Sequence, residues 1–357
     1  LGTFELGQDG ANLNRGPAAG TGGFLMSNGT TLFLGGSNIT FVSNPVTIAP
    51  HSTVNLSEQA TAAYYDTCSG LIFGDALSTN VIGNQFTAQG TAQWNGFPGT
   101  VLIPDGAGLR MYGATGGTNT TFEIDGTGAL FSRNADTITL GALNGNGAIS
   151  VPSNPGATLA IGSKGVNSTF GGTISGTYNL VKVGSATLTL DGSTNSFTTT
   201  INDDGSISTN YFGTNGLAYI GATTVSNGVL AIVAPANLNG TNFTSFALAS
   251  GTAVLDMSRA GYTPDGVTYV TDSTLVLGSP QTLTGIGTIR GSVVAANGTT
   301  VSVGYPLNTN GSPVTGALNI TNSIELGGAV ILNISATNSP TSGEIVSPTI
   351  AIDGTAT

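Results

Sequence analysis

The chain has 357 residues, of which 55 are Gly and only 7% are charged, whereas 39% are hydrophobic. Globular domains usually carry about 25% charged residues, and disordered chains combine low hydrophobicity with high net charge, so this composition fits neither class. The formal net charge of −11, with only seven Lys and Arg, excludes a basic face for nucleic acid or for an anionic membrane surface.

Short apolar segments with alternating polar residues follow one another along the chain, separated by turn residues. They have the length of strands rather than helices, and the abundant Thr, Val, Ile, Asn, Ser and Gly rank low in helix propensity. We therefore expect an all-β chain with almost no helix. The clearest predicted strands are Thr31–Leu34, Ser52–Leu56, Thr158–Ile161, Ala186–Leu190, Gly228–Val233 and Ala253–Asp256.

A sandwich, a propeller or a solenoid could hold many short strands with Gly-rich turns. The single Trp94 does not supply the aromatic period of propeller blades. Stacked turns disfavour like charges about 4.8 Å apart and favour Asn, Thr and Ser ladders, which explains the low charge. We expect a right-handed parallel β-helix with roughly 20 to 25 residues per rung.

A stretch in the middle of the chain, residues 169–200, contains an F-x-G-x-I-x-G segment and then L-x-K-x-G followed by T-L-T-L-x-G. This stretch resembles the autotransporter-associated β-strand repeat of bacterial secreted and surface proteins. The closing T-T-V-x-x-G part lies at Ala222–Ile232, after an insertion at 201–221. Further matches lie at Ile138–Ile149, Leu283–Val303, Gly316–Ile320 and Gly328–Ile334.

The resemblance implies a passenger-type β-helix at the outer surface of a bacterium or outside the cell. We expect one continuous β-helical rod over 1–357, with N-terminal rungs in 1–136 that match only in style and passenger-like repeats in 137–357. No signal peptide is recognisable, so we expect a processed part or fragment of a longer chain. The longest apolar stretch, near Gly228–Pro235, is far below the roughly 20 residues needed to span a bilayer.

The repeat also has a direct physical interpretation. Leu188 and Leu190 alternate with Thr residues, so one face enters the core and the other is able to form a Thr ladder. Gly184 and Gly192 bracket this strand at predicted corners that need positive φ. Lys182, which the family places near this position, is expected to be an exposed charge beside a turn.

Residues for catalysis or metal binding are few. Cys68 is the only cysteine, so it forms no intrachain disulfide, and we expect it to be buried. His51 is the only histidine, so a Ser-His-Asp triad would depend on it, and no G-x-S-x-G occurs; we expect a turn or surface histidine. We expect no metal or cofactor, and we predict no catalytic residue.

Parallel β-helices also include polysaccharide lyases and hydrolases, which use paired carboxylates or a base beside calcium ligands. The candidate carboxylates are Glu123 with Asp125, and Asp203 with Asp204; the turn Asn202–Gly205 is the best calcium candidate, although a solvated turn is favoured. The basic residues show no acidic cluster in sequence: Lys164, Lys182, Arg110, Arg133, Arg259 and Arg290.

Three functions follow from these observations. We favour a structural or adhesive surface protein, a rigid rod that associates with itself through its ends or with other surface components, because the open ends of a solenoid are sheet edges. The alternatives are a glycan-binding module and a polysaccharide-degrading enzyme. Aromatic residues could stack on sugars, although core packing is favoured for them: Tyr64, Tyr65, Trp94, Phe97, Tyr211 and Phe212.

Overall fold

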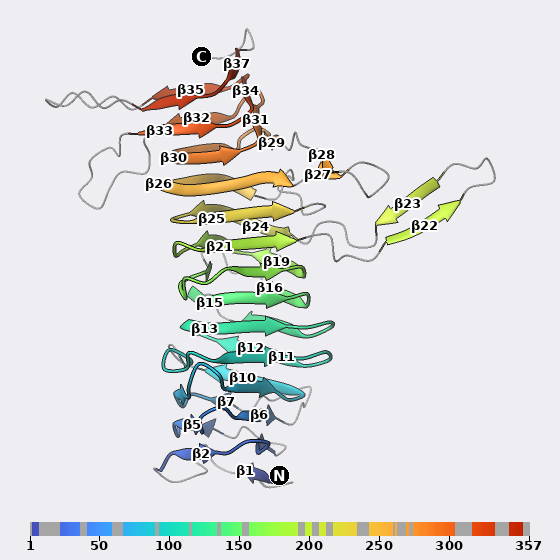
Figure 1. Cartoon of the computed structure of the whole chain (residues 1–357), viewed down its shortest axis with the longest axis vertical. Coiled ribbons are helices and arrows are strands. Elements are labelled where there is room, and N and C mark those ends of the chain that lie inside the picture. The colour runs from blue at the N-terminus through green and yellow to red at the C-terminus, as the bar shows by residue number, and fades with distance from the viewer. Residues whose placement is uncertain are drawn as a thin grey trace, which may run out of the picture. The chain divides into compact units, whose positions relative to one another are not determined.

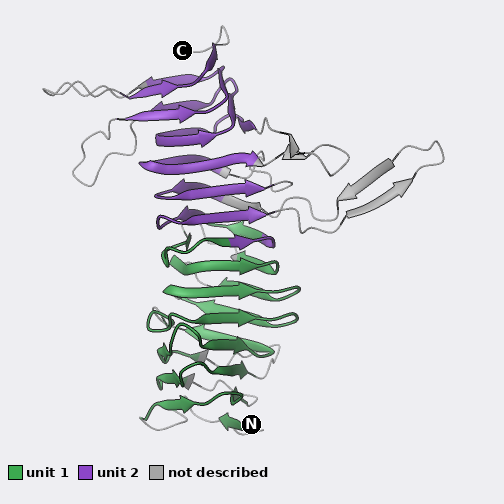
Figure 2. Cartoon of the chain, viewed as in Figure 1, with its two compact units in different colours: residues 1–168, 174–178 green, residues 169–173, 179–357 purple. Residues whose placement is uncertain are grey.

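The computed structural model is an all-β protein (Figure 1), and the residues that it describes contain no helix. The chain divides into two compact units, residues 1–168 with 174–178 and residues 169–173 with 179–357 (Figure 2). The structure describes residues 2–6, 22–35, 41–58, 67–89, 93–113, 116–133, 137–151, 157–191, 197–201, 207–211, 217–233, 243–259, 261–262, 269–270, 274–303, 316–332 and 343–352.

The strands are short throughout. Those of the first unit are β1 (Thr3–Leu6), β2 (Phe24–Met26), β3 (Thr31–Leu34), β4 (Phe41–Val42), β5 (Val46–Ile48), β6 (Thr53–Glu58), β7 (Thr67–Cys68), β8 (Ile72–Phe73), β9 (Thr79–Ile82), β10 (Gln85–Gln89), β11 (Thr100–Ile103), β12 (Gly108–Tyr112), β13 (Gly116–Ile124), β14 (Ala129–Arg133), β15 (Thr137–Gly145), β16 (Ala148–Val151) and β17 (Thr158–Ile161). Two strands hold residues of both units, β18 (Ser168–Phe170) and β19 (Thr173–Thr177).

The second unit has the same kind of strand, with one longer exception. Its strands are β20 (Asn179–Lys182), β21 (Thr187–Asp191), β22 (Phe197–Ile201), β23 (Ile207–Tyr211), β24 (Leu217–Val225), β25 (Val229–Val233), β26 (Phe243–Arg259), β27 (Gly261–Tyr262), β28 (Tyr269–Val270), β29 (Thr274–Leu277), β30 (Thr282–Arg290), β31 (Ser292–Ala295), β32 (Thr300–Val303), β33 (Ala317–Ile320), β34 (Ser323–Leu326), β35 (Ala329–Leu332), β36 (Glu344–Val346) and β37 (Thr349–Ile352).

In the first unit, three columns of parallel strands form the sides of stacked rungs. One column runs β1, β3, β6, β9, β11 and β13, each strand pairing with the next. A second runs β4, β7, β10, β12, β14 and β16, and a third contains β2, β5 and β8. Because the chain passes from column to column before returning one layer higher, the unit is a β-solenoid.

The second unit repeats this arrangement. One column contains β20, β24, β26, β30, β32 and β35, and another contains β21, β25, β26, β30, β33 and β36, with β26 and β30 contributing to both. The third column contains β29, β31, β34 and β37. The predicted fold class, an all-β parallel solenoid, is therefore confirmed.

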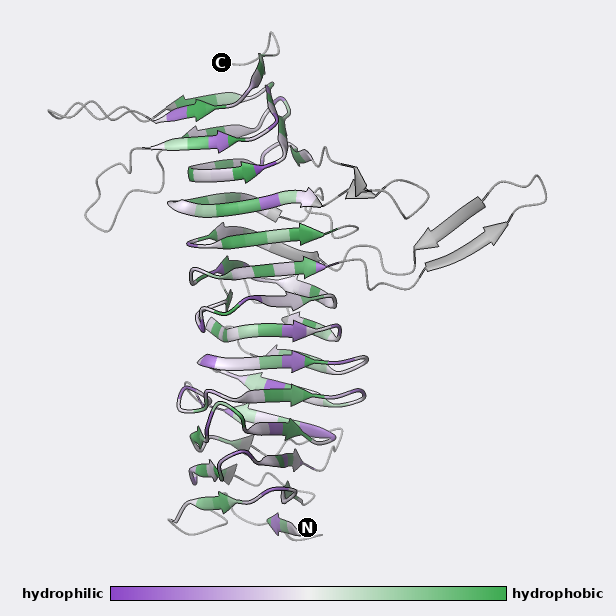
Figure 3. Ribbon diagram, viewed as in Figure 1, coloured by the Kyte–Doolittle hydropathy of each residue, from purple (hydrophilic) through white to green (hydrophobic). Residues whose placement is uncertain are grey.

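Apolar residues at equivalent positions of successive strands form the core of each unit (Figure 3). In the second unit, Leu188, Leu230, Leu255, Ile289 and Ile320 are register partners in one continuous column. None of them is more than 2% exposed. The prediction that Leu188 enters the core is confirmed, as is the same prediction for its neighbour Leu190.

The outward face of β21 differs from the predicted Thr ladder. Thr187 and Thr189 are half-buried and alternate with the core leucines, as expected. Their partners on β25 are Val229 and Ala231, so no Thr ladder continues onto that strand. Side-chain alternation alone does not specify the neighbour on the next rung.

The predicted insertion at 201–221 contains regular structure. Strands β22 and β23 pair in antiparallel register from Phe197↔Tyr211 to Ile201↔Ile207, so the hairpin begins before the predicted boundary. β24, which returns to the parallel column, begins at Leu217. The insertion therefore adds a hairpin between β21 and β24.

Glycines at the corners adopt backbone conformations that other residues rarely adopt. Gly184 has φ 72°, which confirms the predicted corner, whereas Gly192 lies outside the described residues. Gly285 has φ 107° and is the register partner of Leu248, so an added Cβ would overlap the carbonyl group of Leu248. The backbone of this rung stacks on its neighbour at a distance that only glycine permits.

We predict that Gly285→Ala lowers the free energy of unfolding by about 2 to 4 kcal/mol, because the methyl group both strains φ and displaces a stacked backbone. Urea denaturation followed by circular dichroism measures the change. Gly251→Ala is the matched control: Gly251 lies on β26 with no heavy atom within 4 Å of an added Cβ, so its effect stays within about 0.5 kcal/mol. Equal effects of the two variants would contradict the role of close corner stacking.

Candidate functional site

His51 occupies a corner, and its contacts differ from those of a catalytic triad. Its φ is 56°, and its Nε2 lies 3.3 Å from Oδ2 of Asp75. Ser78 donates its hydroxyl to Oδ1 of the same carboxylate at 2.6 Å, and this bond is the main cause of the lowered pKa of Asp75. In a triad the imidazole stands between hydroxyl and carboxylate. Here the carboxylate of Asp75 lies between the imidazole and the hydroxyl. His51 is an exposed residue in a turn, as predicted.

Glu58 is a buried carboxylate that the sequence pattern did not single out. It is 1% exposed, at the end of β6. Its two carboxylate oxygens accept hydrogen bonds from the backbone N–H of Thr87 at 3.0 Å and from the Thr87 hydroxyl at 2.9 Å. On β10, the next residue Ala88 pairs with Cys68 of the two-residue strand β7. The Glu58 carboxylate therefore binds a strand N–H next to the short strand β7.

Of the carboxylates proposed from the sequence, the structure describes Glu123 and Asp125. Glu123 is half-buried on β13, and its pKa is raised by burial and by the charge of Asp125, which follows that strand. Among the described residues, no group of three or more His, Cys, Asp or Glu side chains could hold a metal ion. Asp203, Asp204 and the turn Asn202–Gly205 lie outside the described residues.

The basic side chains that the structure describes make contacts within the protein. Arg290 donates to Asp256 at 2.8 Å, and the guanidinium of the buried Arg110 lies 5.7 Å from the ring centre of Tyr112. Lys164 donates to the carbonyl of Pro98 at 2.7 Å and to the hydroxyl of Thr121 at 2.9 Å. Arg133 and Arg259 lie at the ends of β14 and β26.

The prediction that Lys182 is an exposed charge is wrong. Lys182 is 1% exposed. Its register partner on β24 is the buried Val225, so the lysine occupies a core position. The family pattern gave the residue type at this position, but only the rung register shows that the side chain points inward.

Of the aromatic residues considered for sugar stacking, Trp94 and Phe97 have side chains that the structure describes, and both are buried. Trp94 and Phe97 are 0% exposed. Trp94 donates its indole N–H to Oδ1 of Asn80 at 3.1 Å and packs edge-on against Phe122, with 5.8 Å between ring centres. Their predicted core packing is confirmed. Tyr211 belongs to β23, and Tyr64, Tyr65 and Phe212 lie outside the described residues.

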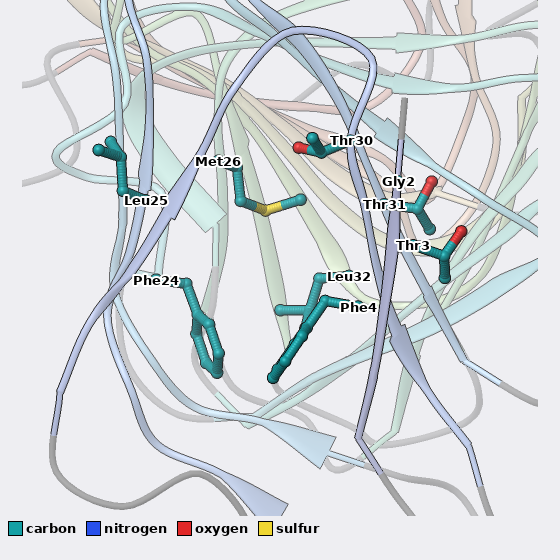
Figure 4. Close-up of a pocket in the computed structure, with 9 residues that line it drawn as sticks. All are labelled: Gly2, Thr3, Phe4, Phe24, Leu25, Met26, Thr30, Thr31 and Leu32. Atoms are coloured by element: carbon teal, nitrogen blue, oxygen red, sulfur yellow. The ribbon is translucent and has the colours of Figure 1, made fainter.

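An apolar pocket lies at β1 and β2 in the first unit (Figure 4). Its volume is about 390 Å³. Phe4 and Phe24 both line it and pack against each other, with 5.8 Å between ring centres and an angle of 52° between ring planes. The lining residues are Gly2, Thr3, Phe4, Phe24, Leu25, Met26, Thr30, Thr31 and Leu32.

The pocket lies at the first described strand of a core column. Phe4 pairs with Leu32, which pairs with Leu56, and the latter two are at most 2% exposed. Phe4 is 56% exposed although it continues the same column. Leu25 on β2 is 74% exposed, but it pairs with the exposed Thr47 and so lies on the outward face. In the described part of the chain, β1 pairs with β3 and β2 with β5, so each has a strand neighbour on one side.

The described residues contain no helix of the length and hydrophobicity that crossing a membrane requires.

Comparison with known proteins gives no relative: no protein-family model matches the chain, and no curated protein or solved structure matches it significantly. The all-β architecture with long parallel columns therefore stands on the structure itself.

The buried Cys68 gives a testable prediction of thiol reactivity. Burial raises the pKa of its thiol to about 11, with a further contribution from the charge of Glu58. Since the thiolate is the reactive form, we expect no reaction with an aromatic disulfide reagent at pH 8 in the native state and one equivalent in denaturant. Ser185→Cys, at an exposed corner, should react with one equivalent in the native protein. Rapid modification of native Cys68 would contradict this burial.

Proposed function

We propose that this chain is an extracellular structural or adhesive protein of the bacterial surface, related to passenger-type β-helices with the autotransporter-associated repeat. The motif in residues 169–200, with its closing part at Ala222–Ile232, supports the family. The stacked rungs of both units support a scaffold, because their interiors are filled by continuous apolar columns. Such a scaffold would act as a rigid support and would display its loops to other surface components.

The observation that carries the proposal is the open apolar layer at β1 and β2. Phe4 occupies a core position, yet more than half of its surface is accessible. Apolar surface of this kind is stabilised by burial at about 25 cal/mol per Å². A strand laid along β1 would cover Phe4 and extend the parallel column by backbone hydrogen bonds.

A second copy of the chain supplies a matching layer. On β37, Ile350 and Ile352 are 47% and 70% exposed, whereas their partners Ile324 and Leu326 on β34 are at most 5% exposed. Both layers thus present apolar residues at alternate positions of parallel strands. Association of the exposed apolar strand of one copy with that of another would be a heterologous contact, and heterologous contacts that do not close grow as fibres.

We predict that the purified chain forms filaments at high concentration, visible by negative-stain electron microscopy and by sedimentation. Phe4→Lys should abolish them, because a charge in the stacking layer would be buried without a partner. Leu77→Lys is the control, since Leu77 is 72% exposed at a turn away from β1 and β2. A monomeric wild-type particle at all concentrations, or filaments that survive Phe4→Lys, would overturn the stacking proposal.

A further inference from the structure

The rung that follows the β22–β23 hairpin must return to the correct register after a long excursion. In the second unit, β24 pairs with β20, with Leu180↔Thr223 and Lys182↔Val225 as partners. The residues that separate these strands include the antiparallel hairpin. A longer connection costs more entropy to close, so the returning strand needs specific contacts at its docking position.

Two polar side chains of β20 make such contacts. Oδ1 of Asn179 accepts a hydrogen bond from the backbone N–H of Ala222 at 3.0 Å, across 43 residues of sequence. The ammonium of Lys182 donates to the carbonyl of Asn227 at 3.2 Å, across 45 residues. These contacts lie on either side of the paired residues of β24, so they hold both ends of the docked segment.

Lys182 also binds the corner that follows its own strand. Its ammonium donates to the carbonyls of Val183 at 2.6 Å and Gly184 at 2.8 Å, so its three donors meet three carbonyl oxygens. The two corners are stacked closely: Gly184 and Gly228 have φ 72° and 69°, and a Cβ on Gly228 would lie 2.6 Å from the carbonyl oxygen of Gly184. The lysine therefore binds both corners from the inside.

The partners of this ammonium are carbonyl groups rather than carboxylates. Of the titratable residues described on the neighbouring strands, Asp191 on β21 and Asp256 on β26 are at half-exposed outward positions, and Asp256 binds Arg290 and Ser258. Burial lowers the pKa of Lys182 from 10.5 to about 8. The carbonyl oxygens of the two corners accept hydrogen bonds from the ammonium, but burial still disfavours its charged form on balance.

We propose that Asn179 and Lys182 form a latch that fixes the register of the strand returning from the inserted hairpin, with the Lys182 ammonium as an internal cation shared by the two stacked corners. The latch allows the solenoid to carry an insertion at this rung without loss of alignment in the rungs that follow. It goes beyond the proposed surface function, because it concerns how the solenoid tolerates a displayed segment.

Hydrogen exchange at pH 7 of the full chain tests the latch. The informative amides are Ser226, which donates to the carbonyl of Lys182, and Val229, which donates to that of Ala186. Lys182→Met removes the ammonium donors but keeps a long unbranched side chain. We expect both amides to exchange at least tenfold faster in this variant. Asn179→Ala, at a half-buried site, should accelerate exchange at Ala222. Unchanged protection in both variants would overturn the proposal.

Lys164→Met is the control, because Lys164 is a half-buried lysine in the other unit that likewise donates to a carbonyl. It should leave Ser226 and Val229 unchanged. Equal acceleration by this control would show general loosening and would also overturn the latch. None of these results depends on filament formation. The latch proposal and the proposed surface function can therefore be refuted independently of each other.

The pH profile gives a readout that side-chain packing alone would not move. Between pH 8 and about 10.5 the unfolded chain holds the Lys182 proton while the native chain has released it. Stability rises with pH wherever the unfolded state binds more protons. The wild-type unfolding midpoint should therefore rise relative to that of Lys182→Met across this window. Parallel profiles of the two proteins would contradict a buried titrating ammonium.

Discussion

Close stacking of the backbone at the corners is the constraint on which the rest of this solenoid depends. Parallel strands hydrogen-bond at about 4.8 Å, so each corner must stack on the next at a similar distance. At Gly145, with φ 95°, an added Cβ would overlap the carbonyl group of Ile124 one rung away. The high glycine content follows from this geometry, and so does the low charge, because stacked like charges repel each other.

At these corners, neutral side chains form the hydrogen bonds that link one rung to the next. Asn28 accepts the N–H of Thr53 at 2.9 Å, and Asn95 accepts that of Thr118 at 3.0 Å, each pair one rung apart. Amide and hydroxyl groups satisfy corner N–H groups without the desolvation cost of an ion. The Asn, Ser and Thr content is therefore part of the rung-to-rung bonding.

The fold could be predicted from the sequence because strand alternation and corner glycines are local features. The segments Thr31–Leu34 and Thr158–Ile161 coincide with β3 and β17. Burial of the polar residues could not be predicted, because it depends on which residues of distant rungs become neighbours. Glu58 and Lys182 both lie near the end of a strand, where sequence alone favours exposure. The pocket at Phe4 could not be predicted, because β1 alternates polar and apolar residues in the same way as a strand whose apolar face is covered.

Two of the buried charges, Glu58 and Lys182, lie where the regular repeat is interrupted, whereas the buried Arg110 lies within β12 of a regular column. Glu58 binds the N–H of Thr87 beside β7, a strand of only two residues, and Lys182 binds corners on either side of an inserted hairpin. At both places a charged side chain binds backbone groups of the irregular segment. A charge costs more to bury than an apolar residue, so it is retained where it also fixes register. Irregular features such as the inserted hairpin and the two-residue strand β7 are therefore accommodated with the help of buried charged side chains.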